Sequence, residues 1–587
     1  MRILFDSKRS EYKTPFGCIT PGQDCQLRLQ IPVTVGTKAV RIVVERESGE
    51  RYEEFSMSRG AVEEAYERWD GTVTLPETGL YYYYFRIAGA TGTFRLFKYG
   101  DDTNMEEGGK WQLSCIPADF TTPDWAKGAV IYQVFPDRFC RSGSCDLTGK
   151  TGYYLHEAWE EEVHWQPNEK GEVLNNDFFG GNFRGITEKM DYIASFGTNI
   201  LYLNPISKSF SSHRYDTGDY KTPDPMLGTE EEFKALCAAA HAHGIRVVLD
   251  GVYSHTGADS LYFNRYGTYG DGGAYRDPSS PYRSWYRFQN APDSYDSWWG
   301  FKTLPTVNKL DPSFIRYIIT DPDSVVAHWL SLGADGFRLD VADELPDEFI
   351  RLLKERIRGI KPDALLMGEV WEDASNKISY DTRRRYFVDG ELDSIMNYPF
   401  RQAILDFVRG TDDGSRLQET VMTLAENYPA QVLSCNMNLL GTHDTPRILT
   451  ALVGQGEGSR EQLATQRLTA EQRLWAKKRL KMASFLQFTL PGSPSIYYGD
   501  EAGMEGGKDP FNRRTYPWGK EDPELLEHFR RLGQLRRLYP ALRLGDIYFC
   551  KAEGGELHYL RRYGDQMLRL TMNQHTGEYT LKEETHG

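Results

Sequence analysis

Residues 229–250 read TEEEFKALCAAAHAHGIRVVLD, in which a helical pattern leads directly into a strand pattern. Thr229 can cap a helix while Glu232 reaches back to it, the arrangement called a capping box. The apolar residues that follow recur at intervals of three and four, as one face of a helix requires: Phe233, Leu236, Cys237 and Ala240. Gly244 is suited to end the helix, and residues 245–250 form a short apolar run that is typical of a buried strand. This stretch therefore predicts one helix–strand unit.

The same unit recurs along the chain between about residue 128 and residue 500. Eight short apolar runs alternate with amphipathic helical stretches, and the runs are residues 128–132, 199–203, 245–250, 336–340, 365–369, 393–397, 437–440 and 495–498. One of the helices between them is expected to begin at Asp321, with Pro322 in its first turn, and to end at Gly333. Eight repeats favour an α/β fold of the (β/α)8 TIM-barrel type over a doubly wound sheet.

Other segments lack this alternation of strand and helix patterns, and they predict additional domains. Residues 256 to about 310 are rich in Gly, Tyr, Trp and Asp and show little periodicity, so we expect an inserted subdomain after the third strand. Residues 1–118 alternate polar and apolar positions and contain the run GLYYYYFRI at 79–87, which predicts an N-terminal β-sandwich. The barrel is expected to occupy residues 119–542, and residues 543–587 are expected to form a short C-terminal β-domain.

The composition limits the classes of partner and the compartment. The net charge is −15 and no block of Lys or Arg stands out, so nucleic acid is not an expected partner. No window of about 20 apolar residues occurs, so no membrane contact is expected. The first residues, MRILFDSKRSEYKTPFG, lack the apolar core of a signal peptide, and the eight cysteines form no closely spaced framework. Together these features favour a cytoplasmic protein with a neutral substrate.

Polar side chains gather at the ends of several predicted strands. They are Asp250, His255, Arg338, Asp340, Glu369, His443 and Asp444. In a TIM barrel the carboxyl ends of all strands lie at one face, and this face holds the active site. Any single carboxylate at such a place could be a helix cap or a turn residue. Four of them at strand exits predict a catalytic site instead.

This set of side chains suits the cleavage of a glycosidic bond with retention of configuration. In that reaction one carboxylate attacks the anomeric carbon, and a second carboxyl group protonates the departing oxygen. Arg338 precedes Asp340 by two residues, so both side chains lie on one face of the strand and the cation would keep Asp340 ionised as a nucleophile. Glu369 is then the expected general acid and base, kept protonated by apolar neighbours and by the negative charge of Asp340.

Four segments also resemble, in the same order, the signature segments of the α-amylase family of glycoside hydrolases. They are DGVYSH at 250–255, GFRLD at 336–340, GEVW at 368–371 and GTHD at 441–444. The resemblance covers about residues 120–540. It implies that Asp340 is the nucleophile, Glu369 the acid and base, and Asp444 the third catalytic carboxylate. It also implies cleavage of α-glucosidic bonds through a covalent glycosyl-enzyme intermediate.

The resemblance implies a set of substrate-binding residues as well. The residues that match sugar ligands of the family are His255, Arg338, His443, Tyr215, Asp509 and Arg513. Tyr215 corresponds to the aromatic platform beneath the sugar ring at the cleavage site, and Asp509 and Arg513 correspond to a pair on the non-reducing side. A core tyrosine and a turn residue remain the alternatives for Tyr215 and Asp509. Trp371 stands two residues after the expected acid, so we expect it to stack against the acceptor sugar.

Within the family, the sequence is similar to the neopullulanase, cyclomaltodextrinase and maltogenic amylase group. The N-terminal β-domain and the segments LPTVN at 304–308 and GFRLDVADEL at 336–345 carry this likeness. It implies cyclodextrins, maltooligosaccharides, pullulan or starch fragments as substrates, and a homodimer in which the N-terminal domain serves dimerisation or carbohydrate binding. No cofactor is expected to be required. A structural calcium ion stays open, because Ser254 and Asn182 depart from the family's pattern.

Two other functions remain open on the same residues. An α-glucan transglycosylase of this fold would use the same catalytic groups but pass the sugar to an acceptor sugar rather than to water. A non-catalytic α-glucan-binding protein would need none of these groups, and the presence of Asp340, Glu369 and Asp444 disfavours it. The sequence therefore predicts an α-glucan hydrolase and leaves its preference between α-1,4 and α-1,6 bonds open.

Overall fold

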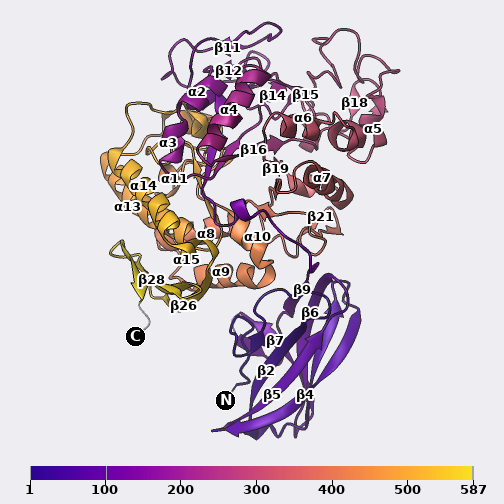
Figure 1. Ribbon diagram of the computed structural model, residues 1–587, viewed down its shortest axis with the longest axis vertical. Helices are drawn as coiled ribbons and strands as arrows, with labels where there is room; N and C mark the ends of the chain where they lie inside the picture. The colour runs from indigo at the N-terminus through magenta and orange to yellow at the C-terminus, as the bar shows by residue number, and fades with distance from the viewer. Residues whose placement is uncertain (1, 101, 585–587) are drawn as a thin grey trace. The chain divides into compact units, whose positions relative to one another are not determined.

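The computed structural model describes residues 2–100 and 102–584, and the chain divides into two compact units (Figure 1). The first unit comprises Met1–Thr121, Asp373–Leu392 and Arg416–Leu433. The second unit comprises Thr122–Glu372, Asp393–Ser415 and Ser434–Gly587, and it contains every residue that the sequence places in the active site. Within the described residues, no helix combines the length and the apolar character that crossing a membrane requires.

The N-terminal part of the first unit is an antiparallel sheet that folds into a sandwich, as predicted. Its strands run in the order β1-β2-β5-β4-β3-β6-β7-β8, and β9 pairs with β6. Their bounds are β1 Lys13–Thr14, β2 Asp24–Pro32, β3 Ala39–Arg46, β4 Arg51–Glu63, β5 Tyr66–Thr74, β6 Gly79–Ala88, β7 Thr93–Tyr99, β8 Asp102–Asn104 and β9 Trp111–Cys115. The tyrosine-rich run at 79–87 forms almost the whole of β6.

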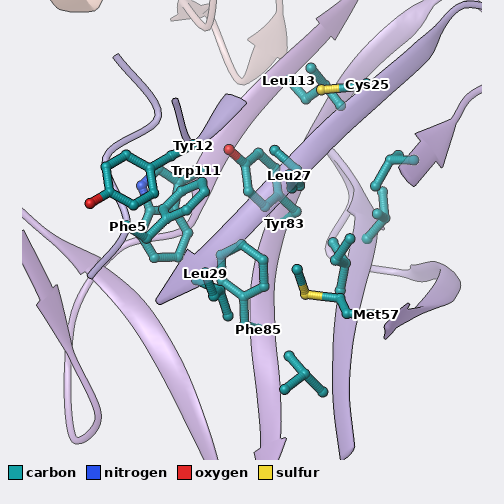
Figure 2. Close-up of a cluster of buried hydrophobic side chains, with 14 of the residues drawn as sticks. Phe5, Tyr12, Cys25, Leu27, Leu29, Met57, Tyr83, Phe85, Trp111 and Leu113 are labelled. Atoms are coloured by element: carbon teal, nitrogen blue, oxygen red, sulfur yellow. The ribbon is translucent and has the colours of Figure 1, made fainter. Parts of the chain in front are cut away.

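Figure 2 shows the apolar core of the sandwich. Leu29 of β2 and Phe85 of β6 both contribute to it, so strands that do not pair with each other meet across the core. Phe5 packs edge-on against two rings, with centroids 4.9 Å from those of both Phe85 and Trp111. Successive side chains of a strand point to opposite faces, so Tyr83 and Phe85 both reach the core. Core packing therefore explains the alternate aromatic residues of β6 that include Tyr83 and Phe85.

A buried ion pair joins the first strand of this unit to helix α9 (Ser415–Asn427). Lys13 Nζ lies 2.9 Å from Glu426 Oε1, and both side chains are almost fully buried. Ser7 Oγ donates a hydrogen bond of 3.0 Å to the other carboxylate oxygen. Burial is the largest single influence on the pKa of Lys13 and lowers it, but the charge of Glu426, its hydrogen bond and nearby cysteines together outweigh burial, so the net pKa is raised. Lys13 is therefore charged, and it supplies the positive charge that balances the buried carboxylate of Glu426.

Lys13→Met is expected to lower the free energy of unfolding by about 3–5 kcal/mol, because it leaves the Glu426 carboxylate buried without its cation. Chemical denaturation followed by tryptophan fluorescence measures this loss. The double variant Lys13→Met/Glu426→Leu removes both charges and should recover most of the stability. A loss below about 1 kcal/mol in the single variant would show that the pair contributes no more than an exposed ion pair does.

The second unit contains a nearly closed barrel of eight parallel strands, which confirms the predicted fold. The strand order is β23-β20-β19-β16-β13-β10-β25-β24. A parallel bridge between Met396 and Met437 links the two ends of this order. The bounds are β10 Ile131–Val134, β13 Ile200–Leu203, β16 Arg246–Gly251, β19 Gly336–Leu339, β20 Leu365–Gly368, β23 Ser394–Ile395, β24 Met437–Leu439 and β25 Ser493–Tyr497. Each of the eight apolar runs in the sequence overlaps one of these strands.

The helices lie between these strands and after the last of them. Their bounds are α1 Pro136–Phe139, α2 Phe183–Glu188, α3 Met190–Ala194, α4 Glu230–Ala242, α5 Pro312–Ile315, α6 Val325–Ser331, α7 Asp347–Ile360, α8 Tyr398–Arg409, α9 Ser415–Asn427, α10 Ala430–Cys435, α11 Ile448–Ala451, α12 Arg460–Thr465, α13 Ala470–Thr489, α14 Pro523–Leu538 and α15 Pro540–Leu544. The predicted capping box of α4 is present. Thr229 Oγ1 accepts from the Glu232 amide at 3.3 Å, and Glu232 Oε2 accepts from the Thr229 amide at 3.0 Å.

The helix expected at Asp321 begins later than the sequence predicted. Helix α6 starts at Val325, because Ser324 caps it by accepting a hydrogen bond from the Ala327 amide at 3.4 Å. Asp321 itself is extended and ends a π-helical turn at Arg316–Thr320. The prediction favoured Asp321 and its following proline over a second capping residue three positions later.

The segments outside the barrel repeat also follow the predicted arrangement. Residues 256–310 contain only short elements, among them the paired strands β17 (Phe288–Asn290) and β18 (Ser294–Tyr295). The other short strands of the second unit are β11 Tyr154–Leu155, β12 Asp177–Phe178, β14 Ser207–Ser209 and β15 Thr217–Pro223. In the first unit β21 Ile378–Ser379 pairs with β22 Thr382–Arg383. After the barrel, four antiparallel strands follow in sequence order: β26 Asp546–Glu553, β27 Glu556–Tyr563, β28 Gln566–Asn573 and β29 Glu578–Glu584.

Candidate active site

The predicted catalytic residues meet at the carboxyl ends of the barrel strands. Asp250 lies near the end of β16, Asp340 follows β19 directly, and Glu369 follows β20 directly. His443 and Asp444 stand a few residues beyond β24. Because β16, β19 and β20 are neighbours in the sheet, their ends bring three carboxylates together.

Arg338 is the centre of this cluster. Its Nη1 lies 2.7 Å from Asp250 Oδ1 and 3.0 Å from Asp340 Oδ1. Its Nη2 lies 2.7 Å from Glu369 Oε2, although without hydrogen-bond alignment. The guanidinium group is fully buried and the three carboxyl groups are buried or nearly so. One cation therefore holds three carboxyl groups in one low-dielectric site.

Two further donors fix the carboxyl group of Glu369. The indole nitrogen of Trp371 donates to Oε1 at 2.9 Å, and the backbone amide of Val341 donates to Oε2 at 2.8 Å. Val341 has a φ of 39° and a ψ of 66°, a left-handed conformation that costs a β-branched residue free energy. This backbone turn directs the amide that follows Asp340 towards Glu369, so it couples the positions of the two carboxyl groups.

The third predicted carboxylate, Asp444, lies at an exposed edge of the cluster. His443 Nε2 is 3.1 Å from Asp444 Oδ2, and Arg513 Nη2 is 3.5 Å from Asp444 Oδ1. Arg513 also holds Asp509, with Nη1 2.9 Å from Oδ1, and its Nε donates to the His443 carbonyl at 3.0 Å. The structure thus connects the predicted Asp509–Arg513 pair to the catalytic cluster.

Tyr215 joins Asp250 to His443. Its hydroxyl donates to Asp250 Oδ2 at 2.8 Å and lies 2.6 Å from His443 Nε2. Gln133 donates to His443 Nδ1 at 3.0 Å, so the ring proton sits on Nε2. Burial and the nearby charges of Arg338 and other cations hold the pKa of His443 well below its usual range, so the ring is neutral. The rings of Tyr215 and His443 are stacked, 5.3 Å apart.

His255 is buried close to the same residues, but its ring is fully engaged by the protein. Its Nε2 lies 3.0 Å from the Tyr215 carbonyl oxygen, and its Nδ1 lies 3.0 Å from Ser254 Oγ. Burial lowers its pKa to about 4. In this arrangement His255 supports the backbone of Tyr215, and a sugar hydroxyl would have to displace one of the two contacts to bind it.

Three residues of the cluster were missed in the sequence analysis: Tyr202, Gln133 and Asn204. Tyr202 donates to Asp250 Oδ2 at 2.7 Å, and Asn204 Nδ2 donates to the Tyr215 hydroxyl at 3.0 Å. Gln133 also donates to Asn204 Oδ1 at 3.1 Å. A signal was present, because Gln133 is a polar residue inside β10 and Asn204 directly follows β13, the same position that identified the carboxylates.

The electrostatics of Asp340 reflect the crowding of negative charge. Burial is the main cause that raises the pKa of Asp340 well above its ordinary value, and the charges of Glu369, Asp250 and Asp444 add to the rise. Arg338 opposes it. The sequence analysis expected Arg338 to keep Asp340 ionised. Arg338 does lower the pKa of Asp340, but burial raises it by more. The cluster therefore retains a proton to higher pH than isolated carboxyl groups would.

Asp250→Asn is expected to move the acidic limb of the pH profile of kcat/KM to lower pH. The pKa of Asp340 is raised, so this group ionises only at higher pH and activity is lost as the pH falls through it. Removing the negative charge of Asp250 lowers the pKa of Asp340, so the acidic limb of the profile moves to lower pH. The measurement is kcat/KM against pH for both proteins. An acidic limb that stays in place or moves to higher pH would contradict this electrostatic account.

Aromatic side chains lie beside the carboxylate cluster, because Trp371 is hydrogen-bonded to Glu369 and the ring of Trp298 lies 5.4 Å from that of His255. Trp371 is 47% exposed and its ring stacks on Tyr398, with centroids 3.8 Å apart. In the inserted segment, Trp298 and Trp299 stack at 4.7 Å, and Trp299 is 72% exposed. These flat, accessible rings can pack against the faces of sugars.

The residues around Asn182, where the sequence left a structural calcium ion open, do not fit that ion. Arg138 Nε lies 2.6 Å from Asp137 Oδ2, and its Nη2 lies 3.7 Å from Asp177 Oδ2, so a guanidinium group already neutralises both acids. Asn182 uses its oxygen to cap α2 and donates its amide to the Ser142 carbonyl at 2.8 Å. Among the described residues, no group of three or more acidic, His or Cys side chains is arranged to hold a metal ion.

The chain is similar to several known proteins. Residues 133–534 match the family described as alpha amylase, catalytic domain. An amylopullulanase of Thermoanaerobacter thermohydrosulfuricus is 37% identical over 95% of this chain, which spans only 41% of that protein. A cyclomaltodextrinase of Geobacillus thermopakistaniensis is 33% identical over 78% of this chain and 70% of its own length. The structure of a type III pullulan hydrolase from Thermococcus kodakarensis superposes with a TM-score of 0.67 at 27% identity, covering 97% of this chain and 94% of that one.

Proposed function

Because the chain belongs to the α-amylase family of glycoside hydrolases, we propose that it hydrolyses α-glucosidic bonds in short α-glucans with retention of configuration. Asp340 attacks the anomeric carbon, and the departing glycosidic oxygen takes the proton of Glu369. The sugar is then held as an ester of Asp340. Glu369, now ionised, takes a proton from water, and the water oxygen attacks the anomeric carbon and releases Asp340.

The observation that carries this proposal is the shared contact of Asp340 and Glu369 with Arg338. Retaining glycosidases keep their two carboxyl groups about 5–5.5 Å apart, without room for a water molecule between acid and base as inverting enzymes require. One guanidinium group that contacts both carboxyl groups supports the shorter spacing. Asp444 lies beside the cluster on its exposed edge, where it can accept hydrogen bonds from sugar hydroxyl groups.

The substrate class follows from the relatives and from the exposed rings. Similar proteins are described as amylopullulanase, cyclomaltodextrinase and pullulan hydrolase, which supports cyclodextrins, maltooligosaccharides and pullulan as substrates. Trp371 is half exposed and hydrogen-bonded to the proposed acid, so it offers a platform for the sugar on the leaving-group side.

Chromatography of the products from β-cyclodextrin, pullulan and soluble starch tests this function. We expect the cyclodextrin to be opened to maltose and glucose, pullulan to release panose, and starch to react more slowly. Products longer than the starting oligosaccharide as the main outcome would identify an α-glucan transglycosylase instead. The absence of any product from all three substrates would overturn the proposed function.

A further inference from the structure

A cavity of about 270 Å³ lies apart from the active site in the second unit. It is formed by the end of α8, one face of α13 and the turn between β28 and β29. Trp475, Lys478, Arg479 and Met482 of α13 line it, at spacings that place them on one side of a helix. Its volume lies just below the range of roughly 300–1,000 Å³ that drug-sized ligands occupy, so its ligand is small.

The charge of this cavity is opposite to that of the whole chain. The protein carries a net charge of −15, yet Arg409, Lys478, Arg479 and His575 line the cavity and no carboxylate is among the described residues that do so. Neighbouring lysines of α13 are paired, since Lys477 lies 2.8 Å from Asp522 Oδ2. In the described part of the chain, Lys478 has neither an ion pair nor a side-chain hydrogen bond, and its ammonium group is available to a ligand.

Arg409 and Arg479 are held in place by backbone carbonyl groups, and each has an N–H group without an acceptor among the residues that the structure describes. Arg409 donates through Nε to the Ala451 carbonyl at 3.0 Å, and Arg479 donates through Nη1 to the Leu452 carbonyl at 2.7 Å. Arg479 Nη2 also donates to the Arg409 carbonyl at 3.3 Å. Among the described residues, Arg409 Nη1 and Arg479 Nε have no acceptor. These fixed guanidinium groups are a pre-organised set of donors for an acceptor-only ligand.

Trp475 adds a flat apolar surface to this cationic site. Its side chain is 57% exposed, although a large aromatic ring is usually at least partly packed. The guanidinium carbon of Arg479 lies 3.8 Å from the ring centroid, so the orientation of the indole is fixed by a cation–π contact. The accessible part of the ring can pack against the ring of a ligand.

From these contacts we propose that the cavity binds a small phosphate monoester, with the phosphate held by Lys478, Arg409 and His575 and with the ring of the ligand packed on Trp475. Arginine and lysine side chains have no acceptor atoms, and phosphate oxygens in turn only accept at neutral pH apart from a residual proton. A neutral glucan is a poorer match, because its hydroxyl groups would have no carboxylate acceptor among the described residues that line the cavity. Sugar phosphates and nucleoside monophosphates share the required chemistry, and binding measurements distinguish them.

Isothermal titration calorimetry of the full chain with glucose 6-phosphate, AMP and inorganic phosphate tests the site. We expect at least one of the two esters to bind, and the tighter one identifies the natural class. Binding should weaken as salt is added, because the contact is ionic. No binding of either ester would overturn the proposal. Inorganic phosphate binding as tightly as the esters would overturn the role of Trp475.

Charge-reversed variants locate the binding. Lys478→Glu should weaken ester binding at least about tenfold, since it replaces an attractive contact with a repulsive one. Lys234→Glu makes the same charge change at an exposed position of α4 and should leave binding unchanged. Trp475→Ala should weaken the esters more than inorganic phosphate. Thermal melting verifies that all three proteins are folded. Equal affinity in Lys478→Glu and the original chain would contradict the assignment.

Discussion

Asp340→Asn is expected to lower kcat on β-cyclodextrin by about 10⁴-fold or more, while the protein remains folded. The amide of asparagine has no charge and cannot form the glycosyl ester, so the covalent route is lost. The change is nearly isosteric. The contact of Arg338 with the remaining oxygen can be kept, so we expect the melting temperature to change little.

Initial rates are measured at a saturating substrate concentration. The protein must be highly purified, so that traces of other enzymes do not account for the residual activity. Asp124→Asn is the matched control, because the Asp124 side chain is 95% exposed and lies far along the chain from the catalytic residues. That variant should retain full activity. An Asp340→Asn protein with a tenth of the original kcat would show that another group is the nucleophile.

Glu369→Gln is expected to lower kcat on glucans by about 10²–10⁴-fold, the usual contribution of a positioned general acid. In this variant, formation of the glycosyl ester of Asp340 should be much less affected when the leaving group needs no proton. α-Maltosyl fluoride releases fluoride, a good leaving group, so its reaction with Asp340 does not require an acid. The variant should therefore release a burst of fluoride and then slow down, because the ester of Asp340 lacks a general base for its hydrolysis.

This comparison separates the two carboxyl groups from each other. Glu369→Gln should show the burst, and Asp340→Asn should not, although both are slow on cyclodextrin. Trp371→Phe removes the indole donor to Glu369 Oε1 and keeps a smaller aromatic ring on Tyr398, so it tests this hydrogen bond while part of the stacking surface remains. If Glu369→Gln lost the fluoride reaction as completely as the glucan reaction, Glu369 would not act through protonation of the leaving group.

The sequence was sufficient to predict the barrel and the strand ends at which the candidate catalytic side chains gather. Both follow from local patterns that leave little choice, such as the capping box at Thr229 and the buried run that ends at Asp250. Asp340 and Glu369 could be proposed as catalytic residues because four carboxylates at strand exits are hard to explain as caps and turns alone.

Other features of the site depend on contacts that no local pattern encodes. The strained backbone of Val341 and its hydrogen bond to Glu369 arise only when β19 and β20 are paired in the barrel. The engagement of His255 by the Tyr215 carbonyl depends on a loop 40 residues earlier in the chain. The net pKa of Asp340 depends on how deeply the completed barrel buries it.

The central claim is that Asp340 and Glu369 cleave α-glucosidic bonds with retention of configuration. Proton NMR of the first minutes of maltoheptaose hydrolysis tests it most directly, because the two anomers of a newly released reducing end give separate signals before they interconvert. Two displacements at the anomeric carbon predict that the α-anomer accumulates first and then equilibrates towards the β-anomer. Initial release of the β-anomer would mean a single displacement by water, and the assignment of Asp340 as a covalent nucleophile would be wrong.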